Sequence, residues 1–118
     1  MAVLALDHIQ LAMPPGREAD TRAFYGGPPG LDEETKPPGL AERGGCWFKR
    51  GALKVHLGVE NDFRPARKAH PAFIVDDVRM LAARAWLSGG GGLASCGYNR
   101  VYVDDPLGNR LELMEPKP

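Results

Sequence analysis

The chain has 118 residues, of which 43% are hydrophobic, so it is large enough to form one compact domain with its own core. Fifteen basic and fifteen acidic residues give a formal net charge of zero, which excludes a bulk electrostatic attraction to nucleic acid or to an anionic membrane. No apolar stretch approaches the roughly 20 residues that span a bilayer, so no membrane partner is predicted.

The first half of the chain predicts a strand, a helix and three further strands. In chain order these are a strand over residues 3–13, a helix over 17–25, and strands over 31–36, 45–50 and 53–59. Residues 37–44 are rich in proline and glycine and are predicted to form a turn. Residues 61–68 have no apolar period and are the predicted linker.

The same plan restarts after the linker. A strand is predicted over residues 69–75, and Asp76 and Asp77 supply the N-cap of a helix. The apolar positions of that helix follow an amphipathic spacing and are Val78, Leu81, Ala82, Ala85 and Trp86. Residues 89–92 are glycines that end the helix, and strands follow over 93–96, 100–103 and 109–114. We therefore predict a single domain, 1–118, built from a module over 1–60 and a module over 69–118.

Three histidines and one glutamate occupy matching positions in the two halves. His8 and His70 lie on the opening strands, whereas His56 and Glu112 lie on the closing strands. A strand with one buried face seldom has a histidine or a carboxylate facing inward unless that group has a partner. Four such residues on four strands suggest one shared partner, and the most economical partner is a divalent metal ion.

The residues leave two questions about this site open. If His56 binds, three imidazoles and one carboxylate suit Ni²⁺, Zn²⁺, Co²⁺ or Mn²⁺; if it does not, His8, His70 and Glu112 form a triad suited to Fe²⁺. A buried cation is the alternative partner of Glu112. Arg110 is the candidate for this cation, but it faces the same side two residues away and is predicted instead to flank the site.

Several cations are candidates for binding a substrate carboxylate or phosphate, because guanidinium and ammonium groups bind such oxyanions. The substrate-binding candidates are Arg64 and Lys68, in the predicted linker, and Arg110; a solvated linker is the alternative interpretation of the first two. Cys46 and Cys96 match no metal or redox spacing and are interpreted as free thiols in a reducing cytosol. The apolar N-terminus has no basic leader, and we expect a cytoplasmic protein.

Five motifs together resemble the vicinal oxygen chelate superfamily, which includes glyoxalases, extradiol dioxygenases, fosfomycin resistance proteins and bleomycin resistance proteins. In this sequence they are residues 6–9, 24–25, 55–60, 69–77 and 105–109, the last leading to Glu112. The resemblance covers nearly the whole chain. It implies an α+β fold in which two βαβββ modules with curved mixed sheets form a metal-containing cleft. Its metal positions fall on His8, His56, His70 and Glu112.

The resemblance also implies a function. The leading hypothesis is a metal-dependent, glyoxalase-like lyase or isomerase that acts on a small vicinal-oxygen substrate through bidentate metal chelation, with Glu112 moving the proton. The alternatives are an Fe(II) extradiol-type dioxygenase, or a non-catalytic resistance module that binds a drug or metabolite, since bleomycin-binding relatives keep the fold and lack the metal ligands. Small relatives commonly pair modules between chains, so a homodimer is expected.

Overall fold

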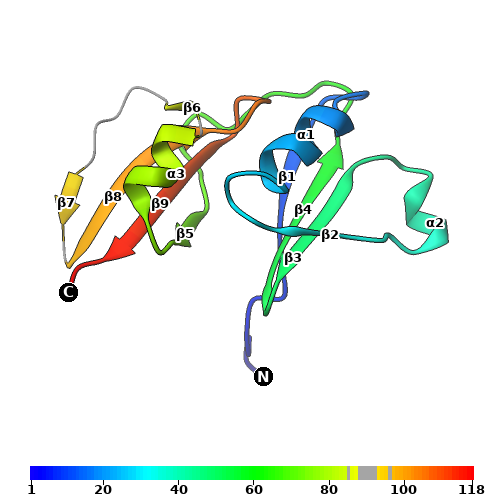
Figure 1. The fold of residues 1–118 in the computed structure, drawn as a ribbon. Helices are drawn as coiled ribbons and strands as arrows, with labels where there is room; N and C mark the ends of the chain where they lie inside the picture. The colour runs from blue at the N-terminus through cyan, green and yellow to red at the C-terminus, as the bar shows by residue number, and fades with distance from the viewer. Residues whose placement is uncertain (85, 88–92, 96) are drawn as a thin grey trace. The chain divides into compact units, whose positions relative to one another are not determined.

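The structure is a computed structural model that describes residues 1–84, 86–87, 93–95 and 97–118. Its elements in chain order are β1 (Ile9–Met13), α1 (Glu18–Tyr25), β2 (Asp32–Glu34), α2 (Pro38–Ala41), β3 (Cys46–Arg50), β4 (Leu53–Val59), β5 (Ala72–Ile74), α3 (Val78–Arg84), β6 (Trp86–Leu87), β7 (Leu93–Ser95), β8 (Tyr98–Asp104) and β9 (Arg110–Pro116) (Figure 1). They fall into two units, Met1–Phe63 and Arg64–Pro118.

Each unit contains one mixed sheet. In the N-terminal unit the strand order is β1-β4-β3-β2, with β1 parallel to β4 and the other pairs antiparallel. In the C-terminal unit the order is β5-β9-β8-β6, and β7 also pairs with β8. Here too the opening strand, β5, is parallel to the closing strand, β9. The predicted α+β class with two βαβββ modules is thereby confirmed, and each opening strand lies beside the closing strand of its own module.

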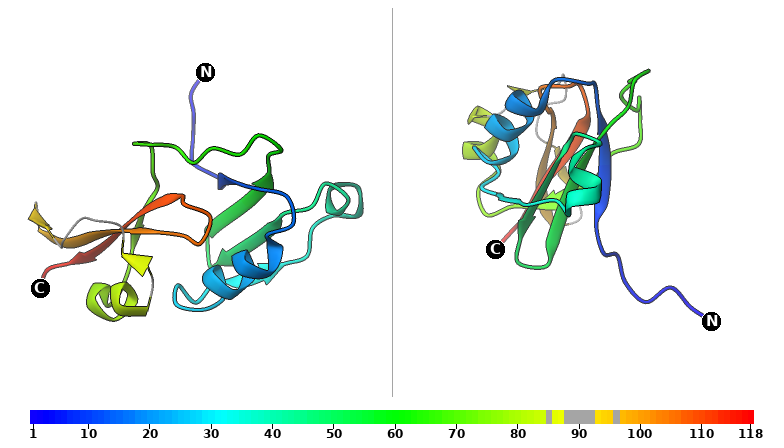
Figure 2. Two further views of the ribbon diagram at one scale, coloured as in Figure 1. Left: turned by 90° about the horizontal axis from the view of Figure 1, so that it is seen from above. Right: turned by 90° about the vertical axis from the view of Figure 1, so that its right-hand side faces the viewer.

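A helix covers one face of each sheet (Figure 2). In the N-terminal unit, Tyr25 of α1 is 1% exposed and its ring lies 5.5 Å from that of Phe48 on β3, which is also 1% exposed. Val55 and Leu57 of the closing strand β4 are also buried in this layer. The corresponding buried residues of the C-terminal unit are Val78, Val101, Val103, Leu107, Leu111 and Leu113. Burial of such side chains contributes about 1.5–3 kcal/mol each.

The two opening strands are shorter than predicted. β1 begins at Ile9 rather than at residue 3, because Ile9 pairs with Val55 and β4 itself begins only two residues earlier, at Leu53. The residues before His8 extend away from the sheet (Figure 2). β5 begins at Ala72 rather than at residue 69, after Pro71, whose missing N–H cannot contribute to a ladder. His8 and His70 therefore precede their strands instead of lying within them.

Two other predicted elements also differ. α3 ends at Arg84, and Trp86, which was expected on the helix, lies in β6 with its backbone paired to Asp104. Aromatic residues favour strands, and Trp86 can pair with β8 at this position. Ala85 and the glycines at 89–92 lie outside the described residues. The predicted turn over 37–44 contains the short helix α2, which starts with proline, a residue that is well tolerated in the first turn.

The predicted N-cap of α3 and the free thiol predicted at Cys46 are confirmed. Asp77 caps α3, because its Oδ1 accepts the backbone N–H of Met80 at 3.0 Å. Cys46 is a free thiol that is 1% exposed, and burial raises its pKa; Cys96 lies outside the described residues. In the described part of the chain, no helix has the length and apolar character needed to cross a membrane.

The turn before β3 depends on a glycine, and Gly45→Ala is expected to destabilise the protein by about 2–4 kcal/mol. Gly45 has a φ of +84°, and an added Cβ would overlap the backbone carbonyl of Leu57. Its N–H also donates to Glu18 Oε2 at 2.9 Å, which fixes the turn to α1. Urea denaturation measures the change. Gly51→Ala separates the two causes, because Gly51 has a φ of +59° but open space, and about 1 kcal/mol is expected there. A loss at Gly45 no larger than that at Gly51 would contradict the proposed steric cause.

Candidate metal centre

In the N-terminal unit, three rings are stacked on the sheet face that α1 leaves uncovered. His56 of β4 lies between Trp47 of β3, with ring centroids 4.1 Å apart and planes 4° apart, and His8, also at 4.1 Å. Trp47 and His56 are direct cross-strand partners. His56 is 6% exposed, and burial lowers its pKa, with the nearby His8 acting in the same direction. The structure therefore brings His8 and His56 together and favours a neutral His56, the form that binds metals.

His8 is oriented by its neighbour in the sequence. Its Nδ1 lies 2.9 Å from Asp7 Oδ2, and the hydrogen bond to His8, followed by the charge of Lys54, lowers the pKa of Asp7. An imidazole that donates a hydrogen bond from Nδ1 to a carboxylate has the lone pair of Nε2 available for a metal ion. This arrangement is common at metal sites. Asp7 is 75% exposed, so the interaction orients the ring and contributes little to stability.

In the C-terminal unit, His70 connects a backbone carbonyl to the predicted carboxylate ligand. Nδ1 lies 2.8 Å from the carbonyl oxygen of Lys68, and Nε2 lies 3.0 Å from Glu112 Oε1. Glu112 is positioned by the parallel pairing of β5 and β9 and by its N–H, which donates to the Pro71 carbonyl at 3.0 Å. The structure thus brings His70 and Glu112 into direct contact.

The hydrogen positions of His70 imply that a positive group lies between its Nε2 and the Glu112 carboxylate. A carbonyl only accepts hydrogen bonds, so Nδ1 of His70 carries the hydrogen directed at Lys68. Nε2 then presents a lone pair to the Glu112 carboxylate unless a positive group lies between them, either a second ring proton or a metal ion. Nitrogen and carboxylate donors are those that Zn²⁺, Ni²⁺, Co²⁺, Mn²⁺ and Fe²⁺ accept. The pair fits the predicted metal, although within neither unit do three or more His, Cys, Asp or Glu side chains of the described residues gather as a metal site.

Glu112 does have a cationic partner, and it is not the expected one. Its Oε2 accepts a hydrogen bond from Arg100 Nη1 at 3.1 Å, and the residue is only 5% exposed. Arg110, the predicted alternative partner, instead lies over the ring of Tyr102, 4.3 Å from its centroid. The β8–β9 register explains this, because Arg100 stands opposite Met114, next to Glu112 on the same face. That register is not visible in the sequence.

The two cations predicted in the linker differ from Arg110 in their surroundings. The side chains of Arg64 and Lys68 are both exposed, and Lys68 acts on the site through its backbone carbonyl. The sequence did not indicate this carbonyl, the carboxylate of Asp7 or the guanidinium of Arg100. For Asp7 a signal existed, since an acidic residue directly before a histidine can fix its tautomer.

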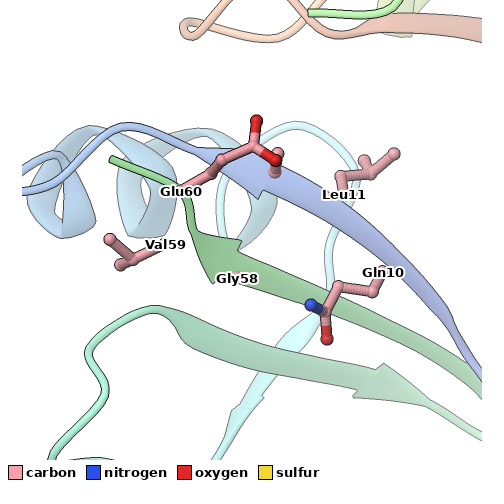
Figure 3. Close-up of a pocket in the computed structure, with 6 residues that line it drawn as sticks. Gln10, Leu11, Gly58, Val59 and Glu60 are labelled. Carbon is pink, nitrogen blue, oxygen red and sulfur yellow. The ribbon is translucent and has the colours of Figure 1, made fainter. Parts of the chain in front are cut away.

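A pocket of about 330 Å³ lies at the ends of β1 and β4, beyond His56. It is lined by Gln10, Leu11, Ala12, Gly58, Val59 and Glu60 (Figure 3). The side chain of Gln10 reaches across β4 over Gly58, where an added Cβ would overlap its amide nitrogen. Gly58 therefore creates the space in which this amide lies. The amide of Gln10 and the carboxylate of Glu60 supply the polar side-chain groups of the pocket.

No protein-family model and no curated protein matches the sequence. Among solved structures, the chain is similar to a protein from Bacillus anthracis described as a glyoxalase family protein, with 43% identity, a TM-score of 0.85, and coverage of 99% of this chain and 98% of that one. It is also similar to a glyoxalase/dioxygenase from Nostoc punctiforme, with 23% identity, a TM-score of 0.72, and coverage of 100% and 99%.

A third similar structure is the fosfomycin resistance protein FosX from Listeria monocytogenes, with 15% identity, a TM-score of 0.73, and coverage of 98% of this chain and 96% of that one. At 23% and 15% identity, the second and third similarities establish the fold alone. The first combines higher identity with nearly complete coverage of both chains.

Proposed function

This chain belongs to the glyoxalase family of the vicinal oxygen chelate superfamily, and we propose that it is a metal-dependent, glyoxalase-like lyase or isomerase acting on a small molecule with two neighbouring oxygen atoms. The observation that carries the proposal is the His70–Glu112 pair. His70 donates from Nδ1 to a backbone carbonyl and directs Nε2 at a carboxylate oxygen 3.0 Å away, so the pair presents one nitrogen and one oxygen ligand of the kind that a divalent ion would bind.

We assign four residues to the metal: His8 and His56 from one module, and His70 and Glu112 from the other. A bound divalent ion supplies Lewis acidity toward the substrate oxygens. Glu112 holds and moves the proton between neighbouring carbons, with Oε2 fixed by Arg100 and Oε1 directed at His70. The low exposure of Glu112 limits the access of competing water to its carboxylate.

One observation favours a second candidate. The ring of His56 is packed between two other rings, and the residue is 6% exposed. If His56 serves only this structural role, the remaining His8, His70 and Glu112 form the triad suited to Fe²⁺, and the function becomes that of an extradiol-type dioxygenase.

Metal analysis of the purified protein followed by turnover assays separates the candidates. The lyase or isomerase is expected to contain close to one Ni²⁺, Zn²⁺, Co²⁺ or Mn²⁺ per chain and to convert α-ketoaldehyde thiol adducts. The dioxygenase is expected to contain Fe²⁺ and to open catechols. A protein that binds no metal and turns over neither class would contradict both and favour a non-catalytic drug- or metabolite-binding module.

We further propose that the working form is a homodimer in which modules from two chains complete each site. Both sheets have edge strands, β1 and β2 in one unit and β5 in the other, and open edges favour pairing. Mixing inactive His8→Ala protein with inactive Glu112→Ala protein tests this, because each mixed dimer would regain one intact site of two. Recovery of part of the activity is expected. No recovery after subunit exchange has been demonstrated would show that each site is built within one chain.

A further inference from the structure

Two arginines lie on the face of the C-terminal sheet that carries Glu112. The β8–β9 register pairs Tyr102 with Glu112 and Asp104 with Arg110. Because residues two apart on a strand face the same side, Arg100 and Arg110 share this face with Tyr102 and Glu112. The opposite face is the buried layer beneath α3, where Val103 and Leu111 are almost fully covered.

The two guanidinium groups are engaged differently. Arg100 donates to Glu112 Oε2, so its charge is matched by that carboxylate. Arg110 contacts the ring of Tyr102, and among the described residues it has no ion pair, since Asp104 opposite it lies beyond ion-pair distance. Stacking on an aromatic ring engages the flat face of a guanidinium and leaves its in-plane N–H donors available. Arg110 is thus a positioned cation whose hydrogen-bonding edge is unused.

Tyr102 joins this cation to the candidate metal centre. One contact of its ring is the cation–π contact with Arg110, and another is an edge-to-face contact with His70, with centroids 5.2 Å apart and planes at 89°. In the described part of the chain its hydroxyl has no hydrogen-bond partner, so it is a second available donor on the same face. A single side chain therefore fixes the spacing between Arg110 and the His70–Glu112 pair.

We infer that Arg110 and Tyr102 form an anion-binding subsite, and that the substrate carries a carboxylate or phosphoryl group in addition to its vicinal oxygens. This inference rests on the proposed function for the role of His70 and Glu112. Arg110 and Glu112 are two residues apart on β9, about 6.6 Å along a strand. The anionic group and the vicinal oxygens of the ligand are separated by a similar distance, as in a small aromatic acid.

A matched pair of probes tests the subsite. 3,4-Dihydroxybenzoate and its methyl ester share the vicinal oxygens and the ring and differ in one negative charge. Their dissociation constants are measured by NMR titration with metal-free protein and with Zn²⁺-loaded protein. The wild type is expected to bind the acid about tenfold or more tightly than the ester in both forms. Arg110→Gln is expected to lose about tenfold to a hundredfold in affinity for the acid, the effect of removing a charge-assisted hydrogen bond, with the ester changed less than twofold.

Three further variants test whether the Arg110 charge and the Tyr102 hydroxyl are the groups responsible. Arg110→Lys keeps the charge and is expected to restore part of the preference for the acid. Tyr102→Phe keeps the stacking ring and is expected to lose only the hydroxyl contribution, a few-fold in affinity. Arg79→Gln removes the same charge from an exposed position on α3 of the same unit and is expected to change neither constant.

Equal affinity of the wild type for acid and ester, or an equal effect of Arg110→Gln and Arg79→Gln, would overturn the inference. Failure of Zn²⁺ to bind, or to tighten either probe, would count against the proposed function. In that case the ratio of the dissociation constants for acid and ester in the metal-free protein still tests the subsite, so the two failures are distinguishable.

Discussion

Replacement of His70 by alanine is expected to lower the affinity for Zn²⁺ by about a hundredfold or more while leaving the fold intact. Loss of groups that merely orient a ligand costs about tenfold to a hundredfold, and loss of the ligand itself costs at least as much. The side chain is only partly buried, at 23% exposure, so its removal leaves no large cavity. Competition with a chromophoric chelator measures the affinity, and circular dichroism checks the fold.

Two variants control this experiment. Lys68→Ala removes an exposed side chain but keeps the carbonyl that holds His70 Nδ1, so the affinity for Zn²⁺ is expected to be unchanged. His56→Gln is expected to weaken binding less than His70→Ala, because it leaves the His70–Glu112 pair intact. If His70→Ala binds Zn²⁺ as tightly as the wild type does, His70 is not a ligand and the proposed metal centre is wrong.

Asp105→Ala is expected to produce the largest loss of stability, about 3–5 kcal/mol. The carboxylate is 3% exposed and accepts hydrogen bonds from Leu107 N, Asn109 N and Asn109 Nδ2 at 2.8–2.9 Å. Truncation removes all three acceptor contacts and leaves buried donors unsatisfied, each costing about 1–3 kcal/mol. Chemical denaturation monitored by circular dichroism measures the change.

The neighbouring carboxylate provides the matched control. Asp104 is the last residue of β8 and lies on the open face of the sheet, and Asp104→Ala is expected to cost about 0.5 kcal/mol or less. Asp105→Asn keeps the Oδ1 acceptor for the two backbone N–H groups and is expected to destabilise the protein less than Asp105→Ala does. A similar cost for Asp104→Ala and Asp105→Ala would show that this turn is not held by the buried carboxylate.

Much of the fold could be predicted because it is encoded locally. The alternation of β4 gave its bounds correctly, and the apolar residues of β4 and β9 face the helices as expected. The turn at Asp105 was also visible, since aspartate, proline and glycine at these positions favour it. The family resemblance implied mixed sheets, but the parallel pairing of each opening strand with its closing strand was not predicted.

The contacts around the candidate ligands could not be predicted, because they depend on strand register and on backbone groups. Arg100 reaches Glu112 only through the β8–β9 register, and His70 is held by a carbonyl, which has no signature in the sequence. Pro71 shortens β5 and leaves His70 in a loop. Likewise β4 begins only at Leu53, which limits β1, so His8 lies just outside the ladder. The residue types indicated the chemistry, whereas the long-range pairing determined each partner.

The parallel packing of Trp47 against His56 gives the N-terminal module an internal optical reporter. Indole emission is sensitive to whatever touches the ring, and here a candidate ligand covers one face of it at 4.1 Å. Any event that turns His56 away, changes its charge or draws it toward an ion alters the light that Trp47 emits. Metal binding at His56 can therefore be followed by fluorescence in the unlabelled protein. The variant Trp47→Phe distinguishes the emission of Trp47 from that of Trp86.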